Sequence, residues 1–470
     1  MNERVGTMDI VFVGLDLGTS GLRAVALREN GDPVAQAAVT WPGAETHPHR
    51  WRHALEQVLD ALAQTLVGQY HVAALSACST SGTILALDQQ GIPLREAWLY
   101  SDPRGQAQAQ RLGIPSSWGL ARWLWWQEQD PDRARHSFLA HPTDWVLQQL
   151  GGSRGITDHT SALKSGFDLV RYQWPTEWLL KHGLDPDLLP QVVAPGTVIG
   201  YGMTLGMDTE SDRFHGLGSS ETLIVAGLTD GCAAQLAAGA AQVGQVSTSL
   251  GTTLIFKATS SAPLHTPDGS VYAHLHPDRD AWLVGAASST GGGILRQWFP
   301  HQDLAQLDQA IANDAPTGIP CYPLPQPGER FPVADPDFLG CLPQAEPGSL
   351  TFYRALLEGI ACIERFGLER LVTLGIRDPD QLLTTGGASV SAVWLSIRAS
   401  VLARPLVLSR YPQPAVGAAM VAAAGYWGCG ISQAVERLWQ PGQTIWPTQD
   451  YRAHYQDWLG RLEATSAIKA

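Results

Sequence analysis

Two acidic residues stand at the ends of apolar segments, where a carboxylate can be presented to a ligand. Asp16 ends the apolar run that begins at Val11, and Asp230 lies between a strand predicted over 221–228 and an alanine-rich helix predicted over 232–241. The dipole of that helix would keep Asp230 ionised. Asp230 could then accept a proton from an alcohol that attacks a phosphoryl group, or it could simply cap the helix, as Asp commonly does.

A glycine-rich turn follows Asp16. Residues 11–27 have the pattern of a strand, a polar turn and a second strand, and Gly18 and Gly21 would let a ligand approach the backbone closely. Backbone N–H groups at such a tip form a concavity that suits a phosphate, and Asp16 beside it could hold a hydrated Mg²⁺ or a sugar hydroxyl. The alternative is an ordinary surface turn, in which Gly, Ser and Thr are common.

The same pattern recurs about half a chain later. Leu17-Gly18-Thr19 matches Leu250-Gly251-Thr252, and each copy opens a segment of domain size. We infer two domains of like topology, each opening with a hairpin that faces a shared cleft; a coincidence of two Gly-Thr turns is the alternative.

Two further glycine turns, at 291–293 and 386–387, lie before predicted helices. The four turns together fit a nucleotide held by backbone N–H groups and helix N-termini. The chain contains neither the Gly-x-x-x-x-Gly-Lys-Ser/Thr motif of P-loop enzymes nor a Gly-x-Gly-x-x-Gly motif after its first strand.

The remaining periodicities predict an α/β chain. Strands over 11–27, a hairpin at Asn30-Gly31 and a strand over 33–41 open the fold, and a helix over 51–66 and a strand over 72–77 follow. Strands then alternate with helices. A helix over 118–126 carries four Trp residues, which indicates a core stripe rather than a ligand site.

Composition limits the partners. The 470 residues have 44% hydrophobic and 16% charged side chains and a net charge of −13, so we expect a globular protein that binds a small molecule rather than nucleic acid or an anionic membrane. Six scattered cysteines and the absence of a signal peptide favour a reduced, cytoplasmic chain. The apolar run 415–424 is too short to span a bilayer. A monomer or a homodimer is expected.

Hydroxyl, carboxylate and guanidinium groups that suit a polyol occur in two further turns. Ser81 follows a predicted strand, and Asp102 and Arg104 lie in Tyr-Ser-Asp-Pro-Arg. The alternative for Asp102 and Arg104 is a salt bridge within a surface turn. The histidines show no metal-ligand spacing.

Taken together, these motifs resemble the FGGY carbohydrate kinases over about residues 10–439. The resemblance is carried by Asp16-x-Gly18-Thr19-Ser20, Thr229-Asp230-Gly-x-Ala-Ala, Ser249-Leu250-Gly251-Thr252-Thr253, Tyr353-Arg354-Ala355-x-x-Glu358-Gly359 and Gly386-Gly387-Ala388-x-x-Ser391-x-x-Trp394. Within the family the chain is most similar to the small cyanobacterial and plant pentulose kinases, through Thr80-Ser81-Gly82-Thr83, Gly292 before Leu295-Arg296-Gln297, and Gly328-Glu329-Arg330-Phe331-Pro332.

The resemblance implies a fold of two ribonuclease-H-like domains, of the actin, hexokinase and Hsp70 ATPase type, around a central cleft. We expect a tail over 1–8, a sugar-binding domain over 9–241, a nucleotide-binding domain over 242–445 and a C-terminal helix over 446–470. The expected cofactors are ATP and Mg²⁺.

The resemblance also implies roles for individual residues. Asp230 would be the general base, and Asp16 would be catalytic and meet the sugar or the metal through water. The sugar would also contact Ser20, Gly21, Arg23 and Ser81. The nucleotide would contact Gly18, Thr19, Gly251, Thr252, Thr253, Gly292, Gly387, Ala388 and Ser391.

The chain departs from the family pattern at a few positions. Ser101 stands where many members have Asn, Val390 and Ser391 replace polar residues of the adenosine turn, and Gln413 replaces an acid. The first departure concerns the sugar and the others the nucleotide. The resemblance favours phosphorylation of D-ribulose to D-ribulose 5-phosphate, with D-xylulose as the alternative acceptor. A non-catalytic sugar or nucleotide sensor, or an ATPase without a sugar, remains the alternative function.

Overall fold

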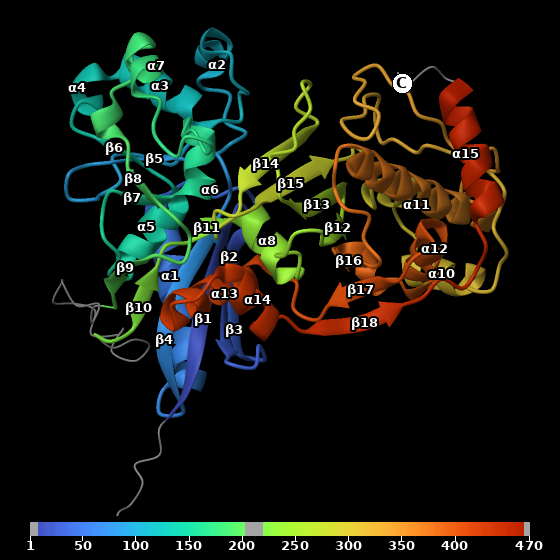
Figure 1. Ribbon diagram of the computed structural model, residues 1–470, viewed down its shortest axis with the longest axis horizontal. Helices are drawn as coiled ribbons and strands as arrows, with labels where there is room; N and C mark the ends of the chain where they lie inside the picture. The colour runs from blue at the N-terminus through green and yellow to red at the C-terminus, as the bar shows by residue number, and fades with distance from the viewer. Residues whose placement is uncertain (1–7, 203–219, 465–470) are drawn as a thin grey trace, which may run out of the picture. The chain divides into compact units, whose positions relative to one another are not determined.

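The computed structural model describes residues 8–202 and 220–464, which form two compact units (Figure 1). Unit 1 holds the chain up to Ala237 together with 277–279 and 413–439, and unit 2 holds 238–276, 280–412 and the chain from Gln440. The sequence-based division placed 413–439 in the second domain. This segment packs against the first sheet, and the structure therefore groups it with unit 1.

The sheet of unit 1 begins with three antiparallel strands, continues with β4 and β10 parallel to the first strand, and ends with β9 antiparallel to β10. Its order is β3-β2-β1-β4-β10-β9, and β11 also pairs with β4. The register places Gly18 opposite Gly21, so that Thr19 and Ser20 form the turn and the predicted hairpin is confirmed. The strands are β1 (Asp9–Gly18), β2 (Gly21–Arg28), β3 (Pro33–Thr40), β4 (Tyr70–Ser79), β9 (Val198–Tyr201), β10 (Leu223–Val225) and β11 (Leu228–Thr229).

Helices cover both faces of this sheet. The odd-numbered residues of β1, from Val11 to Leu17, share an apolar core with α1 (Pro48–Leu66). Alternate residues of a strand face opposite ways, and Gly14 accordingly faces α13 (Pro414–Trp427), which lies beside β1 in Figure 1. Within the described residues no single helix is long and apolar enough to cross a membrane, although α13 and α14 (Ile431–Leu438), bent by 117°, reach that length and composition together.

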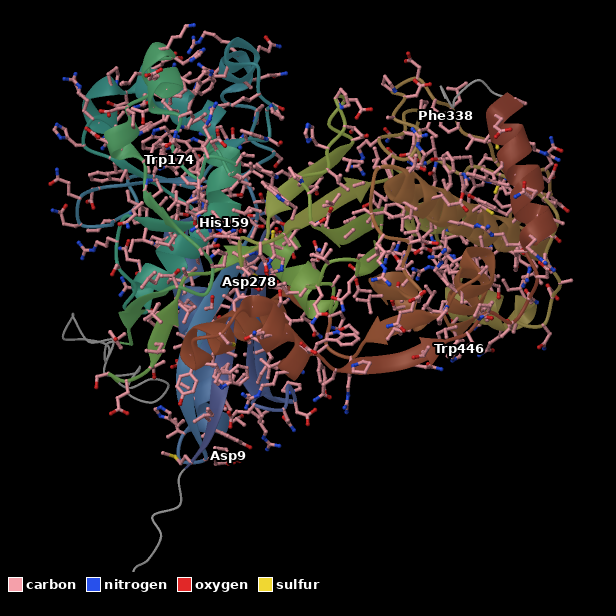
Figure 2. The ribbon with its side chains drawn as sticks, in the orientation of Figure 1. Asp9, His159, Trp174, Asp278, Phe338 and Trp446 are labelled. Carbon is pink, nitrogen blue, oxygen red and sulfur yellow. The ribbon has the colours of Figure 1, made fainter. Side chains whose placement is uncertain are left out.

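A mainly helical insertion lies between β4 and β10. It has its own apolar cluster, in which Trp123 and Trp126 are buried and against which Trp125 packs, so the core prediction is confirmed for these three. Trp118 is only partly buried. Figure 2 labels His159 and Trp174 in this part of the chain. Its elements are α2 (Gln106–Leu112), α3 (Gly119–Gln129), α4 (Pro131–Ala134), α5 (Pro142–Gln149), α6 (His159–Ala162), α7 (Thr176–Lys181), β5 (Leu85–Leu87), β6 (Phe138–Ala140), β7 (Ile156–Asp158) and β8 (Gln191–Val193).

The sheet of unit 2 repeats the arrangement of the first. Its order is β14-β15-β13-β12-β16-β17-β18. The β12–β13 hairpin is antiparallel and β16 lies parallel to β12, as β4 lies parallel to β1. The inferred like topology of the two halves is thereby confirmed. The strands are β12 (Val246–Leu250), β13 (Leu254–Ser260), β14 (Val271–Leu275), β15 (Trp282–Ala287), β16 (Leu382–Thr385), β17 (Leu406–Ser409) and β18 (Pro441–Ile445).

Two long helices build the core of unit 2. The helix α11 (Leu350–Thr373) is buried along most of its length and packs against α12 (Ala392–Leu402). A buried ion pair between Arg354 and Glu358, with Tyr451 bonded to both, fixes α11 to the segment before the last helix. The motif Tyr353-Arg354-x-x-x-Glu358 is therefore largely structural. The other helices are α9 (Gly293–Trp298), α10 (Leu304–Ile311) and α15 (Arg452–Ala464).

Gly14→Ala is expected to destabilise unit 1 because an added Cβ would lie 1.9 Å from the carbonyl oxygen of Ala415. Overpacking of this kind costs about 1–3 kcal/mol. Urea unfolding followed by circular dichroism measures the loss. The control is Gly43→Ala, where an added Cβ meets nothing within 4 Å, and equal unfolding midpoints for the two variants would contradict the packing of β1 on α13.

Candidate functional site

Asp16 and Asp230 lie at the carboxyl edge of the same parallel strands. β4 pairs with β1 on one side and with β11 on the other, and Cys78 of β4 lies opposite both Asp16 and Leu228. Asp230 follows β11 directly and opens α8 (Asp230–Ala237). The predicted place of Asp230, between a strand and a helix, is confirmed. Ligands of open α/β sheets bind outside this edge.

The two carboxylates interact electrostatically. Burial and the charge of Asp230 raise the pKa of the Asp16 carboxyl from 3.8 to about 6. Arg23, opposite Asp16 on β2, opposes this rise, with its Nη1 3.6 Å from Oδ2 of Asp16. The Cys78 thiol also contacts Oδ1 of Asp16, at 3.7 Å. A carboxyl perturbed in this way, beside a second acid, is typical of a functional site.

The turn beside Asp16 contains glycines with different roles. A Cβ on Gly21 would lie 2.4 Å from the carbonyl oxygen of Val39, so close packing of β2 on β3 explains this glycine. A Cβ on Gly18 would meet only loose contacts, the nearest at 3.6 Å. Thr19 is partly buried and Ser20 is exposed.

Ser81 lies just past the end of β4. Its hydroxyl oxygen is buried and has no hydrogen-bond partner among the described residues. A buried hydroxyl without a partner is costly, and a ligand hydroxyl would satisfy it. Asp102 and Arg104, in contrast, form an ion pair with each other, with Arg104 Nε 2.9 Å from Oδ1 of Asp102, and the turn salt bridge is confirmed.

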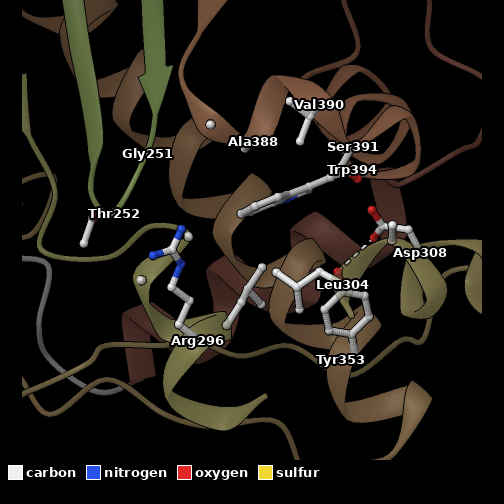
Figure 3. A pocket seen from close by; sticks show the side chains of 15 residues that line it. Gly251, Thr252, Arg296, Leu304, Asp308, Tyr353, Ala388, Val390, Ser391 and Trp394 are labelled. Carbon is white, nitrogen blue, oxygen red and sulfur yellow. Dashed lines mark hydrogen bonds between the residues drawn. The ribbon is translucent and has the colours of Figure 1, made fainter. Parts of the chain in front are cut away.

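A cavity of about 380 Å³ in unit 2 is lined by most of the unit 2 residues that were predicted to contact the nucleotide (Figure 3). The β12–β13 turn, the start of α9 and the turn before α12 supply its wall. Thr253 is not among the lining residues, and Ser391 also caps α12 by accepting a hydrogen bond from the Trp394 amide at 3.0 Å. The predicted residues that line the cavity are Gly251, Thr252, Gly292, Gly387, Ala388 and Ser391.

Packing separates the glycines of these turns into two kinds. A Cβ on Gly291 would lie 2.5 Å from Thr252 O, and one on Gly386, at φ +97°, would lie 2.5 Å from Leu250 O. These two glycines let the turns pack on one another. At Gly251 and Gly387 an added Cβ would meet nothing within 4 Å, so these positions border open space.

The cavity is also lined by residues that were not predicted to contact the nucleotide. The indole of Trp394 forms one wall, and the Tyr353 hydroxyl donates to Oδ1 of Asp308 at 2.8 Å on another (Figure 3). Arg296 points its guanidinium toward the Thr252 turn and makes no ion pair with any described residue. Its place one helical turn after Gly292 was a usable signal, whereas no sequence pattern brings Asp308 to the cavity.

Buried polar groups support the cavity from behind. Arg398 donates to both carboxylate oxygens of Glu364 at 2.7 Å, and also to Thr384 at 2.7 Å and Thr248 at 3.2 Å. Thr248 lies on β12 and Thr384 on β16, the two strands that end at the glycine turns. This network therefore fixes the spacing of the Gly251 and Gly386 turns.

The 328–332 loop has a similar supporting role. Glu329 is buried and accepts hydrogen bonds from the Ser288 hydroxyl at 2.7 Å and from the Ser289 amide at 2.6 Å. Tyr322 donates to the same carboxylate at 2.8 Å. The loop thus holds the segment that leads into the 291–293 turn.

Comparison with known proteins identifies the family. Residues 11–237 match the N-terminal domain of the FGGY family of carbohydrate kinases, and residues 246–426 match its C-terminal domain. The chain belongs to the FGGY family. Its curated relatives include the xylulose kinase of Staphylococcus xylosus, which is 25% identical and covers 95% of this chain and 97% of its own length.

Solved structures of other kinases have the same fold. The gluconate kinase of Lactobacillus acidophilus superposes with a TM-score of 0.82 at 20% identity over 98% of this chain and 99% of its own. The Plasmodium falciparum glycerol kinase with ADP gives 0.83 at 15% identity, also over 98% and 99%. The predicted two-domain α/β fold of the actin and hexokinase type is confirmed.

Asp16→Asn is expected to stabilise the protein at pH 8. The folded protein holds this carboxyl at a pKa of about 6, against 3.8 for the unfolded chain, so stability falls as pH rises from about 4 to 6. A shift of two units corresponds to about 3 kcal/mol. Relative to the wild type, the free energy of unfolding of Asp16→Asn in metal-free buffer should rise by up to about 3 kcal/mol at pH 8. At pH 4 it should rise little.

The control is Asp9→Asn, an exposed acid at the other end of β1, which should change stability little at either pH. A gain for Asp16→Asn that is equal at pH 4 and pH 8 would contradict the raised pKa.

Proposed function

We propose that this FGGY kinase phosphorylates a pentulose, transferring the γ-phosphate of ATP to a hydroxyl of D-ribulose and releasing D-ribulose 5-phosphate and ADP. The observation that carries the proposal is the pair Asp16 and Asp230 at one sheet edge. Just past the end of the strand between them, the buried hydroxyl of Ser81 has no hydrogen-bond partner in the part of the chain that the structure describes. Phosphoryl transfer needs alignment, charge neutralisation and a base, and little else from the protein.

Asp230 is the general base in this mechanism. It accepts the proton of the acceptor hydroxyl as the new oxygen–phosphorus bond forms, and the bond from the γ-phosphorus to the β-phosphate oxygen breaks. Ser81 and Arg23 hold the sugar, together with Ser20 and Gly21 of the turn. The helix dipole of α8 favours the charged form of the Asp230 carboxylate.

The Asp16–Asp230 pair suits a divalent cation. Burial of Asp16 and then repulsion by the partly buried Asp230 raise the pKa of Asp16, and a hydrated Mg²⁺ held by Asp16 through water would relieve that repulsion. Mg²⁺ bound with ATP neutralises charge on the phosphates.

The cavity of unit 2 suits the nucleotide. Its volume, about 380 Å³, lies in the usual range for small-molecule sites. The open backbone at Gly251 and Gly387, with Thr252, Thr253 and Gly292, would bind phosphates, and Ala388 and Ser391 the adenosine. Gly18 and Thr19 would contact the phosphates from the first hairpin, and that role stays a prediction, as does a cleft shared by the two hairpins.

D-Xylulose is the second candidate acceptor. The relative from Staphylococcus xylosus is named a xylulose kinase, which favours a ketopentose as the acceptor. At 25% identity this likeness does not decide between D-xylulose and D-ribulose. Coupled ADP release with D-ribulose, D-xylulose, L-ribulose, ribitol and glycerol ranks kcat/KM directly. A higher kcat/KM for D-xylulose would overturn the choice of acceptor, and no stimulation by any of them would favour a sensor or a sugar-independent ATPase.

Asp230→Asn is expected to lower kcat by about 10²–10⁴, the usual contribution of a general base. Asn caps helices as well as Asp does, so this change keeps a cap and removes the base. Calorimetry should show that the variant still binds the sugar.

Asp130→Asn, at the N-cap of α4, is the matched control and should keep full activity. Full activity of Asp230→Asn would show that the acid is a cap and that the base lies elsewhere.

Arg296→Gln is expected to raise KM for ATP by about 10- to 100-fold, since hydrogen bonds to charged groups contribute about 1.5–3 kcal/mol. KM for the sugar should stay the same because Arg296 lines the unit 2 cavity, whereas the residues proposed for the sugar belong to unit 1. Initial rates at varied ATP measure the effect, with the exposed Arg377→Gln as control. An unchanged KM for ATP would remove Arg296 from the phosphate site.

A further inference from the structure

Unit 1 buries an acid, Asp158, that the mechanism above does not use. Asp158 ends β7 and is 1% exposed. Its carboxylate accepts hydrogen bonds from the amides of Thr160 at 2.8 Å and Ser161 at 3.0 Å, and from their hydroxyls at 2.5 Å and 2.6 Å. Burial raises the pKa of this carboxyl. A buried carboxyl group costs free energy unless it is hydrogen-bonded, and these four donors supply the hydrogen bonds.

The Thr160 hydroxyl extends this cluster to the candidate base. While it donates to Oδ1 of Asp158, its oxygen accepts a hydrogen bond from the backbone N–H of Thr229 at 2.9 Å. A hydroxyl that donates to a carboxylate is a stronger acceptor, because hydrogen bonds in a chain polarise one another. Asp158, Thr160 and Thr229 are all buried.

Thr229 is the residue immediately before Asp230. It closes β11, a strand of two residues that pairs with β4 through Leu228 opposite Cys78 and Thr229 opposite Ser79. The amide of Gly231 donates to Oδ1 of Asp230 at 2.7 Å on the other side. The backbone that aims the Asp230 side chain is thus held by a short strand pairing and by the hydroxyl of Thr160.

We propose that Asp158 and Thr160 are positioning residues of phosphoryl transfer, which fix the Thr229 amide and so hold the Asp230 carboxylate at the acceptor hydroxyl. The inference rests on the proposed function, because it requires Asp230 to be the base. Neither residue needs to contact the sugar or ATP. A small displacement of a catalytic group lowers the rate of the chemical step with little effect on binding.

Thr160→Val is the direct test, because valine has nearly the shape of threonine and lacks the hydroxyl. We expect kcat for the best pentulose to fall by about 10- to 100-fold, and KM for the pentulose and for ATP to change by less than about 3-fold. Thr160→Ser, which restores the hydroxyl, should recover kcat to within about 3-fold of wild type. A loss confined to KM, or a kcat equal to wild type, overturns the proposal.

Ser161→Ala is the matched control. Ser161 lies on the same helix and donates to the other oxygen of the same carboxylate, at 2.6 Å, while the Thr229 amide bonds to Thr160 instead. We expect a similar fall in melting temperature and a kcat close to wild type. A loss of kcat in Ser161→Ala as large as in Thr160→Val would mean general destabilisation and would overturn the proposal.

A double variant links Thr160 to Asp230. If Thr160 acts through the base, Thr160→Val should cause no further loss of kcat in an Asp230→Asn background. Losses that multiply would show that Thr160 acts elsewhere and would overturn the proposal. Should Thr160→Val not fold, Asp158→Asn replaces it, with the same expected pattern in kcat and KM and the same outcomes against it.

Kinetics of the single variants separate the role of Asp230 as the base from the positioning role of Thr160. If Asp230→Asn alone keeps wild-type activity, the base assignment in the proposed function is wrong and the positioning role is overturned with it. If Asp230→Asn is inactive while Thr160→Val matches wild type, the proposed function stands and only the positioning role is overturned.

Discussion

One shared strand determines the geometry of the acidic pair. β4 pairs in parallel with both β1 and β11, so residues that are more than two hundred positions apart end at the same edge of the sheet. The arrangement has an electrostatic cost. Asp16 is only 4% exposed, and its burial together with the charge of Asp230 raises the pKa of the Asp16 carboxyl. Arg23 offsets only part of that cost. Carboxyl groups perturbed by burial together with a neighbouring charge cluster at functional sites.

Buried polar networks lie directly behind the candidate site residues in each unit. In unit 1, Asp158 and Thr160 bond to the backbone before Asp230. In unit 2, Arg398 and Glu364 bond to the threonines of the two strands that end at the glycine turns. Hydrogen bonds in such buried networks hold the backbone segments they join in one arrangement, and the Arg398–Glu364 ion pair itself contributes little net stability.

The glycines of unit 2 show how one residue type meets two constraints. At Gly291 and Gly386 the neighbouring turn approaches too closely for any side chain. At Gly251 and Gly387 the backbone borders the cavity with space beside it. The first pair brings the turns together and the second leaves their N–H groups accessible, and both are needed for a backbone site for phosphate.

The two hairpins, the four glycine turns, the strand-to-helix position of Asp230 and the family could be predicted from single-sequence patterns, because these features depend on local spacing and turn chemistry. Which distant residues join them became clear only from the folded chain. Asp308 reaches the cavity from α10, Thr160 reaches Thr229 from the insertion, and residues 413–439 leave the second half to cover the first sheet. These contacts depend on how helices pack against the sheets, and packing between segments far apart in the chain leaves no periodicity or motif in a single sequence.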